Sequence, residues 1–216
     1  MTTKRAVGEV ALMEDAMESA ESFLDRLASD RPTPGGGAAG ALTGAAAAAL
    51  VGMVCRVTAR HVPSEKVIMS AIEQSDALRV QLRKLIHDDI EAYEAFLDAR
   101  RVSSDLRGPH QQGALQRATL VPIETARAAA SVLELCASVV DIVRVSTVGD
   151  LSVAAALAGA VVEASTLTAR INLRDINDRH FIEKATHDLD AVERIAAARR
   201  EITRRVNART GLEKLV

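Results

Sequence analysis

Two stretches of this chain are rich in alanine and glycine and carry no charge. Residues 32–55 (PTPGGGAAGALTGAAAAALVGMVC) and residues 151–162 contain no Asp, Glu, Lys or Arg. A helix without a polar face must be covered on most sides, either by a protein core or by lipid. Alanine and glycine insert poorly into lipid, and Arg56 and Arg60 follow on the first of these helices. We therefore predict two buried helices of a soluble protein and no membrane span.

The remaining sequence also favours helices and contains nothing typical of a strand. Aromatic residues make up 2% of the chain, and Ala, Leu, Glu and Arg, all good helix formers, dominate it. Breaking residues divide it into about six helices, at residues 14–29, 37–62, 64–101, 114–146, 151–171 and 177–207, with Ser64 as the N-cap of the third, a kink at Pro122 in the fourth and a surface loop over residues 102–113. The sequence predicts an all-α fold in which a single domain, residues 1–216, forms a bundle around the two Ala/Gly-rich helices.

Charge and cysteine content exclude several classes of function. Lys and Arg number 27 against 29 Asp and Glu, so the net charge is -2 and no overall field attracts nucleic acid or an anionic membrane. Acidic residues interrupt the apolar run near the N-terminus, which argues against a signal peptide and predicts a cytoplasmic protein. Cys55 and Cys136 lie in apolar stretches and are expected to be buried free thiols. His180 and His187 share a helix face without a third ligand, so no metal site is predicted.

A run of three glycines, Gly35 to Gly37, stands directly before the first Ala/Gly-rich helix. Glycine lets the backbone approach a neighbouring group closely, and exposed amides at a helix start attract anions. Pro34 to Gly37 are therefore candidates for cradling an anionic or polar part of a substrate. A second interpretation is purely structural: Gly40, Gly44, Ala48 and Gly52 recur every fourth residue and offer a flat side on which another helix can pack.

At this point the sequence resembles a known family. The segment FLDRLASDRPTPGGGAAGALTGAAAAALVGMVCRVT is similar to the opening of the formimidoyltetrahydrofolate cyclodeaminase and methenyltetrahydrofolate cyclohydrolase family. DDIEAYEAFLDA resembles its Asp-x-x-Ala-aromatic element, ALQRATLVPIETA its A-x-x-x-A-x-x-V-P element, and GDLSVAAALAGAVVEASTLTARINL its S-D-x-x-V-A helix that ends in N-L. These segments follow the order of the family over nearly the whole chain.

The resemblance implies an all-helical enzyme that acts at the N5/N10 one-carbon bridge of tetrahydrofolate. Cyclodeaminases close this bridge with loss of ammonia, whereas cyclohydrolases open it with water. Family members are usually dimeric and need no metal, so the expected partners are a small-molecule substrate, such as a tetrahydrofolate derivative, and a second copy of the chain, with no prosthetic group. A homodimer is also expected because six helices cannot easily cover two uncharged ones.

Either reaction moves protons near neutral pH, for which a carboxylate or an imidazole in a partly desolvated cleft is suitable. The candidate catalytic residues are Asp89, Tyr93 one turn later on the same helix face, and Asp150; the candidate substrate-binding residues are Pro34, Gly35, Gly36, Gly37, His61 and Asn172. His87 and Asp88 directly precede Asp89 in the sequence.

Structural interpretations of the same residues remain open. Asp150 can cap a helix, Asp88, Asp89 and Glu91 can form a solvated acidic face, and a lone tyrosine such as Tyr93 is common at the edge of a core. Glu163 stands inside an apolar helix, where a buried carboxylate must be paired or have a raised pKa. It is either a site residue or part of an interface ion pair.

The chain also departs from the family pattern. Residues 58–67 read TARHVPSEKV where the family has a lysine-rich element, Gly149 stands where serine is usual, and Thr168 replaces a family asparagine, although Asn172 remains. Three hypotheses follow. The first is a cyclohydrolase, preferred to a cyclodeaminase because the chain carries no transferase domain. The second is a cyclase or C–N bond hydrolase or lyase of a specialised pathway on the same scaffold. The third is a helical interaction protein without turnover.

Overall fold

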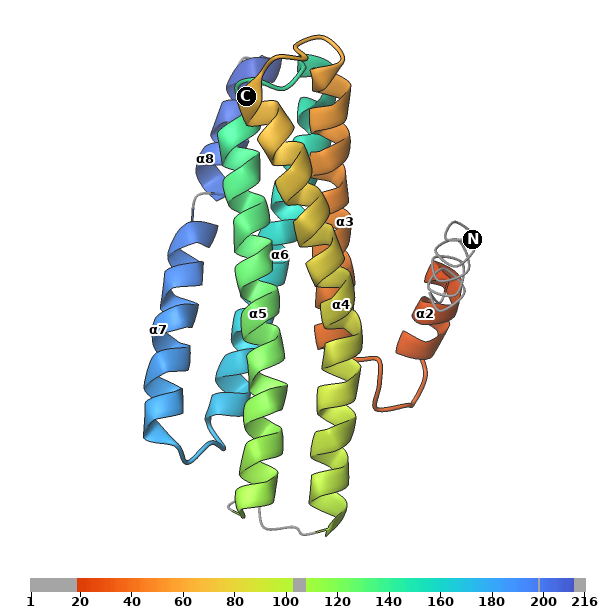
Figure 1. Cartoon of the computed structure of the whole chain (residues 1–216), viewed down its shortest axis with the longest axis vertical. Coiled ribbons are helices and arrows are strands. Elements are labelled where there is room, and N and C mark those ends of the chain that lie inside the picture. Colours follow the sequence, from red (N-terminus) through yellow and green to blue (C-terminus); the bar gives the residue numbers. More distant parts are fainter. Residues whose placement is uncertain (1–18, 103–107, 198, 212–216) are drawn as a thin grey trace, which may run out of the picture.

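The computed structural model describes residues 19–102, 108–197 and 199–211. Within these ranges every regular element is helical, which confirms the all-α prediction (Figure 1). The elements are α2 (Ala20–Leu27), α3 (Gly36–Ala59), α4 (Lys66–Val102), α5 (Pro109–Val139), the 3-10 turn η1 (Val145–Thr147), α6 (Val148–Leu173), α7 (Arg179–Ala196) and α8 (Arg199–Thr210).

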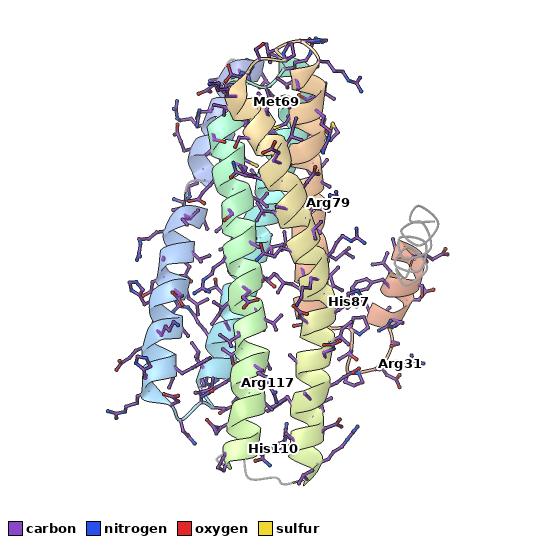
Figure 2. The ribbon with its side chains drawn as sticks, in the orientation of Figure 1. Arg31, Met69, Arg79, His87, His110 and Arg117 are labelled. Carbon is purple, nitrogen blue, oxygen red and sulfur yellow. The ribbon has the colours of Figure 1, made fainter. Side chains whose placement is uncertain are left out.

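Helices α3, α4, α5 and α6 form an antiparallel bundle in which each packs against the next and α6 returns to α3. Met69 marks the first turns of α4 at one end of the bundle, and His110 marks the first turn of α5 at the other (Figure 2). Helices α7 and α8 cover the α5 and α6 side, while α2 lies on the opposite side in this view (Figure 1). Phe23 of α2 is buried and belongs to the main core.

Both Ala/Gly-rich helices are core helices of the bundle. Helices α3 and α6 are long and apolar enough to cross a membrane, but 56% and 50% of their most apolar windows are buried against the other helices. The small residues at every fourth position of α3 allow a close approach of α4. A Cβ on Gly44 would lie 3.0 Å from the Leu82 side chain, and a Cβ on Gly52 would lie 2.9 Å from the Ser75 hydroxyl. The structural interpretation of this spacing therefore holds for the interior of α3.

Many of the side chains of α3 and α6 that the other helices leave uncovered are apolar. Met53 is 37% exposed, Val153 50%, Leu167 60% and Ile171 54%. Ala46 and Ala49 of α3 and Ala156 and Ala160 of α6 are also exposed. We call this surface the α3/α6 face. It runs along the bundle from the start of α6 to its last turn.

Several predicted boundaries are wrong. Half of the predicted loop over residues 102–113 is helical, because Gly108 and Pro109 start α5, with proline at the first helical position where it has no hydrogen bond to lose. Helix α5 ends at Val139 rather than near 146, and the predicted last helix is divided into α7 and α8. Ser64 is not the N-cap of α4, since the Met69 amide donates to the Glu65 carbonyl. Residues 14–18 of the first predicted helix lie outside the described residues.

Candidate active site

One cavity of about 310 Å³ lies where the start of α3, the middle of α4 and the last turns of α6 meet. Its walls combine the turn before α3 with side chains from three helices. The lining residues are Pro32, Thr33, Gly35, Gly36, Gly37, Asp89, Tyr93, Ala118, Thr168 and Asn172. The cavity therefore joins four segments that are distant in the sequence.

Asp89 of α4 points at the start of α3. A Cβ on Gly37 would lie 2.5 Å from the Asp89 Cγ and 2.8 Å from Oδ2, so only glycine leaves room for this carboxylate. The carboxylate accepts a hydrogen bond from the backbone N–H of Ala38. The N-cap residue of α3, Gly35, has no side chain to do so, and Asp89 thus caps α3 from a neighbouring helix. The glycine run is explained by this close approach.

Burial raises the pKa of the Asp89 carboxyl above its ordinary value, and the hydrogen bond from the Ala38 amide offsets part of this rise. The two effects have opposite signs because burial disfavours the charged form, whereas a donated hydrogen bond favours it. A carboxyl with a raised pKa accepts a proton more readily near neutral pH than an exposed aspartate does. Asp89 therefore has the electrostatic environment of a general base or acid.

The other walls of the cavity supply hydrogen-bonding groups. The Asn172 Nδ2 donates to the Ala118 carbonyl at 3.2 Å, which leaves Oδ1 available as an acceptor. The Thr168 hydroxyl donates to the Ala164 carbonyl at 3.0 Å and keeps its lone pairs. The Tyr93 ring is 41% exposed and lies 6.3 Å from the ring of Phe96, centroid to centroid. The cavity can thus hold a polar ring system beside a single carboxylate.

Most of the predicted site residues are brought together. Gly35, Gly36, Gly37, Asp89, Tyr93 and Asn172 line the cavity, and Pro34 lies buried in the same turn. The amide of Ala38, directly after the predicted cradle of Pro34 to Gly37, donates to the protein's own carboxylate. His87 is exposed on α4 and does not line the cavity (Figure 2).

His61 and Asp150 lie at the end of the helical bundle opposite to the cavity. His61 follows the C-terminus of the 24-residue helix α3, about 36 Å from its start. Asp150 is in the first turn of α6, whereas Asn172 is near its end. The Arg144 amide donates to the Thr58 hydroxyl at 3.1 Å and ties these two helix ends together. Within one chain, neither residue reaches the Asp89 cavity.

Two structural expectations for single carboxylates are wrong. Glu163 is exposed rather than buried, and it lines a shallow groove between α6 and the α7–α8 junction. Its side chain points away from the core, so the apolar character of α6 did not bury it. Asp150 is not the N-cap of α6, because that position is held by Thr147.

Four lining residues were not predicted as site residues: Pro32, Thr33, Ala118 and Thr168. Pro32 is the first residue of the PTPGGG motif. Thr33 stands inside the PTPGGG motif, so its place in the motif could have indicated it. Thr168 was noted only as a departure from the family pattern. Ala118 carries no signal in the sequence, because its contribution is a backbone carbonyl that only the packing of α5 against α6 brings to Asn172.

Comparisons with known proteins place this helical bundle in the cyclohydrolase and cyclodeaminase class of enzymes. A sequence profile described as formiminotransferase-cyclodeaminase matches residues 19–191. The methenyltetrahydrofolate cyclohydrolase of Methylorubrum extorquens is 35% identical over 193 residues, which cover 85% of this chain and 93% of that protein. The chain belongs to the formiminotransferase-cyclodeaminase family.

Two further comparisons agree with this assignment. The crystal structure of formiminotetrahydrofolate cyclodeaminase from Thermotoga maritima superposes with a TM-score of 0.80 at 28% identity and covers 90% of this chain and 96% of that one. The formimidoyltransferase-cyclodeaminase of Mus musculus is 26% identical over 183 residues. These residues cover 81% of this chain but 34% of the mouse protein, so the chain spans about a third of that relative.

Proposed function

We propose that this protein is a methenyltetrahydrofolate cyclohydrolase, which opens the methenyl bridge between N5 and N10 with water. The observation that carries the proposal is the desolvated Asp89 carboxylate in a cavity beside the glycine turn. Sequence similarity favours hydrolysis of the bridge over closure of the bridge with loss of ammonia. The cyclohydrolase of M. extorquens is 35% identical over 93% of its length, whereas the mouse formimidoyltransferase-cyclodeaminase is 26% identical over 34% of its length.

In this proposal Asp89 acts as a general base. The methenyl bridge is an amidinium cation, so a nearby carboxylate favours its binding. Asp89 removes a proton from water as the water oxygen bonds to the bridge carbon. The carbon–N5 bond then breaks as the new hydroxyl group loses its proton to solvent and becomes the carbonyl. N5 takes up the proton held by Asp89, and the carbon remains on N10 as a formyl group. The balance is one cation and one water in, one formyl product and one proton out.

The remaining lining residues bind the substrate. Tyr93 offers a ring edge and a hydroxyl, Asn172 offers its free carbonyl oxygen, and Gly35 to Gly37 form a wall without side chains. The scheme as proposed uses no prosthetic group and no metal. We also propose a cytoplasmic location, which the two free thiols of Cys55 and Cys136 support.

Two assays separate the candidate activities. We expect the protein to accelerate the loss of methenyltetrahydrofolate absorbance and to release little ammonia from formiminotetrahydrofolate. Rapid ammonia release with slow hydrolysis would assign the protein to the cyclodeaminases instead. Inactivity on both, together with binding of another cyclic amine in the cavity, would support the alternative of a scaffold adapted to a different substrate.

We propose that the protein is a homodimer formed through the α3/α6 face. The support is the row of exposed apolar side chains on this face, with Leu167 and Ile171 adjoining the cavity residues Thr168 and Asn172. We expect light scattering to give a species of about 46 kDa, twice the chain mass of 23.0 kDa. Leu167→Glu should shift this mass toward the monomer because it places a charge on the face. A 23 kDa species for the unmodified protein would contradict the proposal.

We further propose that Asp150 and His61 act at the cavity of the second copy. A twofold axis perpendicular to α6 through the middle of the α3/α6 face pairs the two helices antiparallel. The start of α6, with Asp150, then lies beside the partner's last turn of α6, where the cavity is. This arrangement reconciles the predicted roles of both residues with their distance from Asp89 in one chain.

Subunit mixing tests this arrangement. We expect Asp150→Asn to lower turnover by about a hundredfold or more with little loss of stability, as for a proton-transfer group. Refolding Asp89→Asn and Asp150→Asn chains together in equal amounts should restore about a quarter of wild-type activity, since half of the dimers are mixed and each mixed dimer has one intact site. An unchanged rate for Asp150→Asn would remove Asp150 from the mechanism. No restoration on mixing would exclude a site shared between chains.

A further inference from the structure

The turn between α2 and α3 forms one wall of the cavity through Pro32, Thr33 and Gly35. Thr33 is 8% exposed, and its hydroxyl donates to the Glu94 Oε1 at 2.9 Å. Glu94 lies on α4 directly after Tyr93 but does not itself line the cavity. The contact therefore joins a buried side chain of the turn to the rigid helix that carries Asp89.

Helix α4 thus holds the glycine segment at two points. Asp89 accepts from the Ala38 amide on one side of the three glycines, and Glu94 accepts from Thr33 on the other. The two carboxylates are five residues apart on α4, or about 7.5 Å along its axis. Gly35, Gly36 and Gly37 lie between the two anchored residues, and glycine has the largest backbone freedom to lose. A flexible segment of this kind keeps one shape only if both of its ends are held.

We propose that Glu94 is a positioning residue of this site: its hydrogen bond from Thr33 holds the glycine turn against α4 and so keeps the cavity in the shape that binds substrate. Its effect on catalysis rests on the proposed function, whereas its effect on the turn does not. A hydrogen bond from a hydroxyl to a carboxylate is among the stronger ones. Glu94 is exposed, whereas its partner Thr33 is buried, so the bond lies at the edge of the solvent.

Kinetics of paired variants measure the effect on substrate. Thr33→Val and Glu94→Ala each remove one partner, and we expect each to raise KM about tenfold with kcat changed by less than about twofold, which is the size of one charge-assisted hydrogen bond. Thr33→Ser and Glu94→Gln keep a donor and an acceptor and should restore KM. The double variant Thr33→Val/Glu94→Ala should be no worse than either single variant. Asp98→Ala, which removes an exposed carboxylate one turn further along α4, should leave KM unchanged.

Amide hydrogen exchange tests the turn without substrate. We expect peptides that cover residues 33–38 to exchange faster in Thr33→Val and Glu94→Ala, but not in Thr33→Ser, Glu94→Gln or Asp98→Ala. Unchanged exchange in the first two variants would overturn the proposal, and so would faster exchange with an unchanged KM. If the wild-type protein does not hydrolyse methenyltetrahydrofolate while exchange responds as expected, the positioning of the turn stands and the proposed function fails.

Discussion

Asp89→Asn should lower turnover by about a hundredfold or more while leaving the protein folded, because it removes a general base and keeps the shape of the side chain. The amide oxygen of asparagine can still accept from the Ala38 N–H, so the cap on α3 survives. The measurement is kcat and the melting temperature of the same preparation. Asp98→Asn, which changes an exposed carboxylate on the same helix, is the matched control and should keep the wild-type rate.

The difference in stability between Asp89→Asn and the wild type should depend on pH with a definite sign. Because the fold raises the pKa of Asp89, ionisation of this carboxyl opposes folding, and wild-type stability falls as the pH rises through the folded-state pKa. The variant lacks this cost. Its melting temperature should therefore equal or exceed that of the wild type at about pH 8. The difference should shrink as the pH falls below about 4, the ordinary pKa of an aspartate, because the carboxyl then becomes protonated in the unfolded state as well as in the folded one.

Two results would count against this role of Asp89. An unchanged rate in Asp89→Asn would leave Asp89 as the cap of α3 and nothing more. A melting temperature well below that of the wild type at neutral pH would show that the carboxylate stabilises the fold, against the sign expected from its burial.

Gly37→Ala should damage both the rate and the fold. The new Cβ would lie 2.5 Å from the Asp89 Cγ and 2.8 Å from Oδ2, so the carboxylate has to leave its position and give up the Ala38 amide. Overpacking of this kind costs about 1–3 kcal/mol, and we expect a melting temperature several degrees lower, at about 2–4 °C per kcal/mol for a chain of this size. Turnover should fall by about a hundredfold, as for the loss of Asp89 itself.

Two other glycines are matched controls for Gly37→Ala. A Cβ on Gly36 or on Gly113 would meet nothing within 4 Å. Gly113→Ala, in an exposed position of α5, should keep the rate and stabilise the protein by about 0.5–1 kcal/mol, the usual gain of alanine in a helix. Gly36→Ala should fold normally. Any effect of this substitution on catalysis should appear in KM, because Gly36 lines the cavity. Wild-type activity in Gly37→Ala would contradict the close approach of Asp89.

Much of the fold could be predicted because the strongest signals were local. The uncharged compositions of residues 32–55 and 151–162 identified α3 and α6 as core helices. Helix ends were predicted less well because they depend on single backbone positions. The sequence predicts a loop where α5 starts at Pro109, because Gly108 and Pro109 are helix breakers in the absence of information on the helix that follows them.

Part of the site could be predicted because its signals, too, are local in the sequence. Asp89, Tyr93 and the glycines belong to compact motifs, and the antiparallel packing of α3 against α4 brings these motifs together. The hydrogen bond from Thr33 to Glu94 spans 61 residues, and no spacing rule connects them. Asp150 and His61 were predicted as site residues by resemblance alone, without any measure of how far their helices would carry them from Asp89.

The most direct test of the account is the initial rate of methenyltetrahydrofolate absorbance loss, measured with wild-type protein and with Asp89→Asn at one pH and corrected for spontaneous hydrolysis. The account predicts a clear acceleration by the wild type, proportional to protein concentration, and about a hundredfold less with the variant. No acceleration by a folded, dimeric wild-type protein would contradict the proposed function. Equal acceleration by both proteins would contradict the role of Asp89 in it.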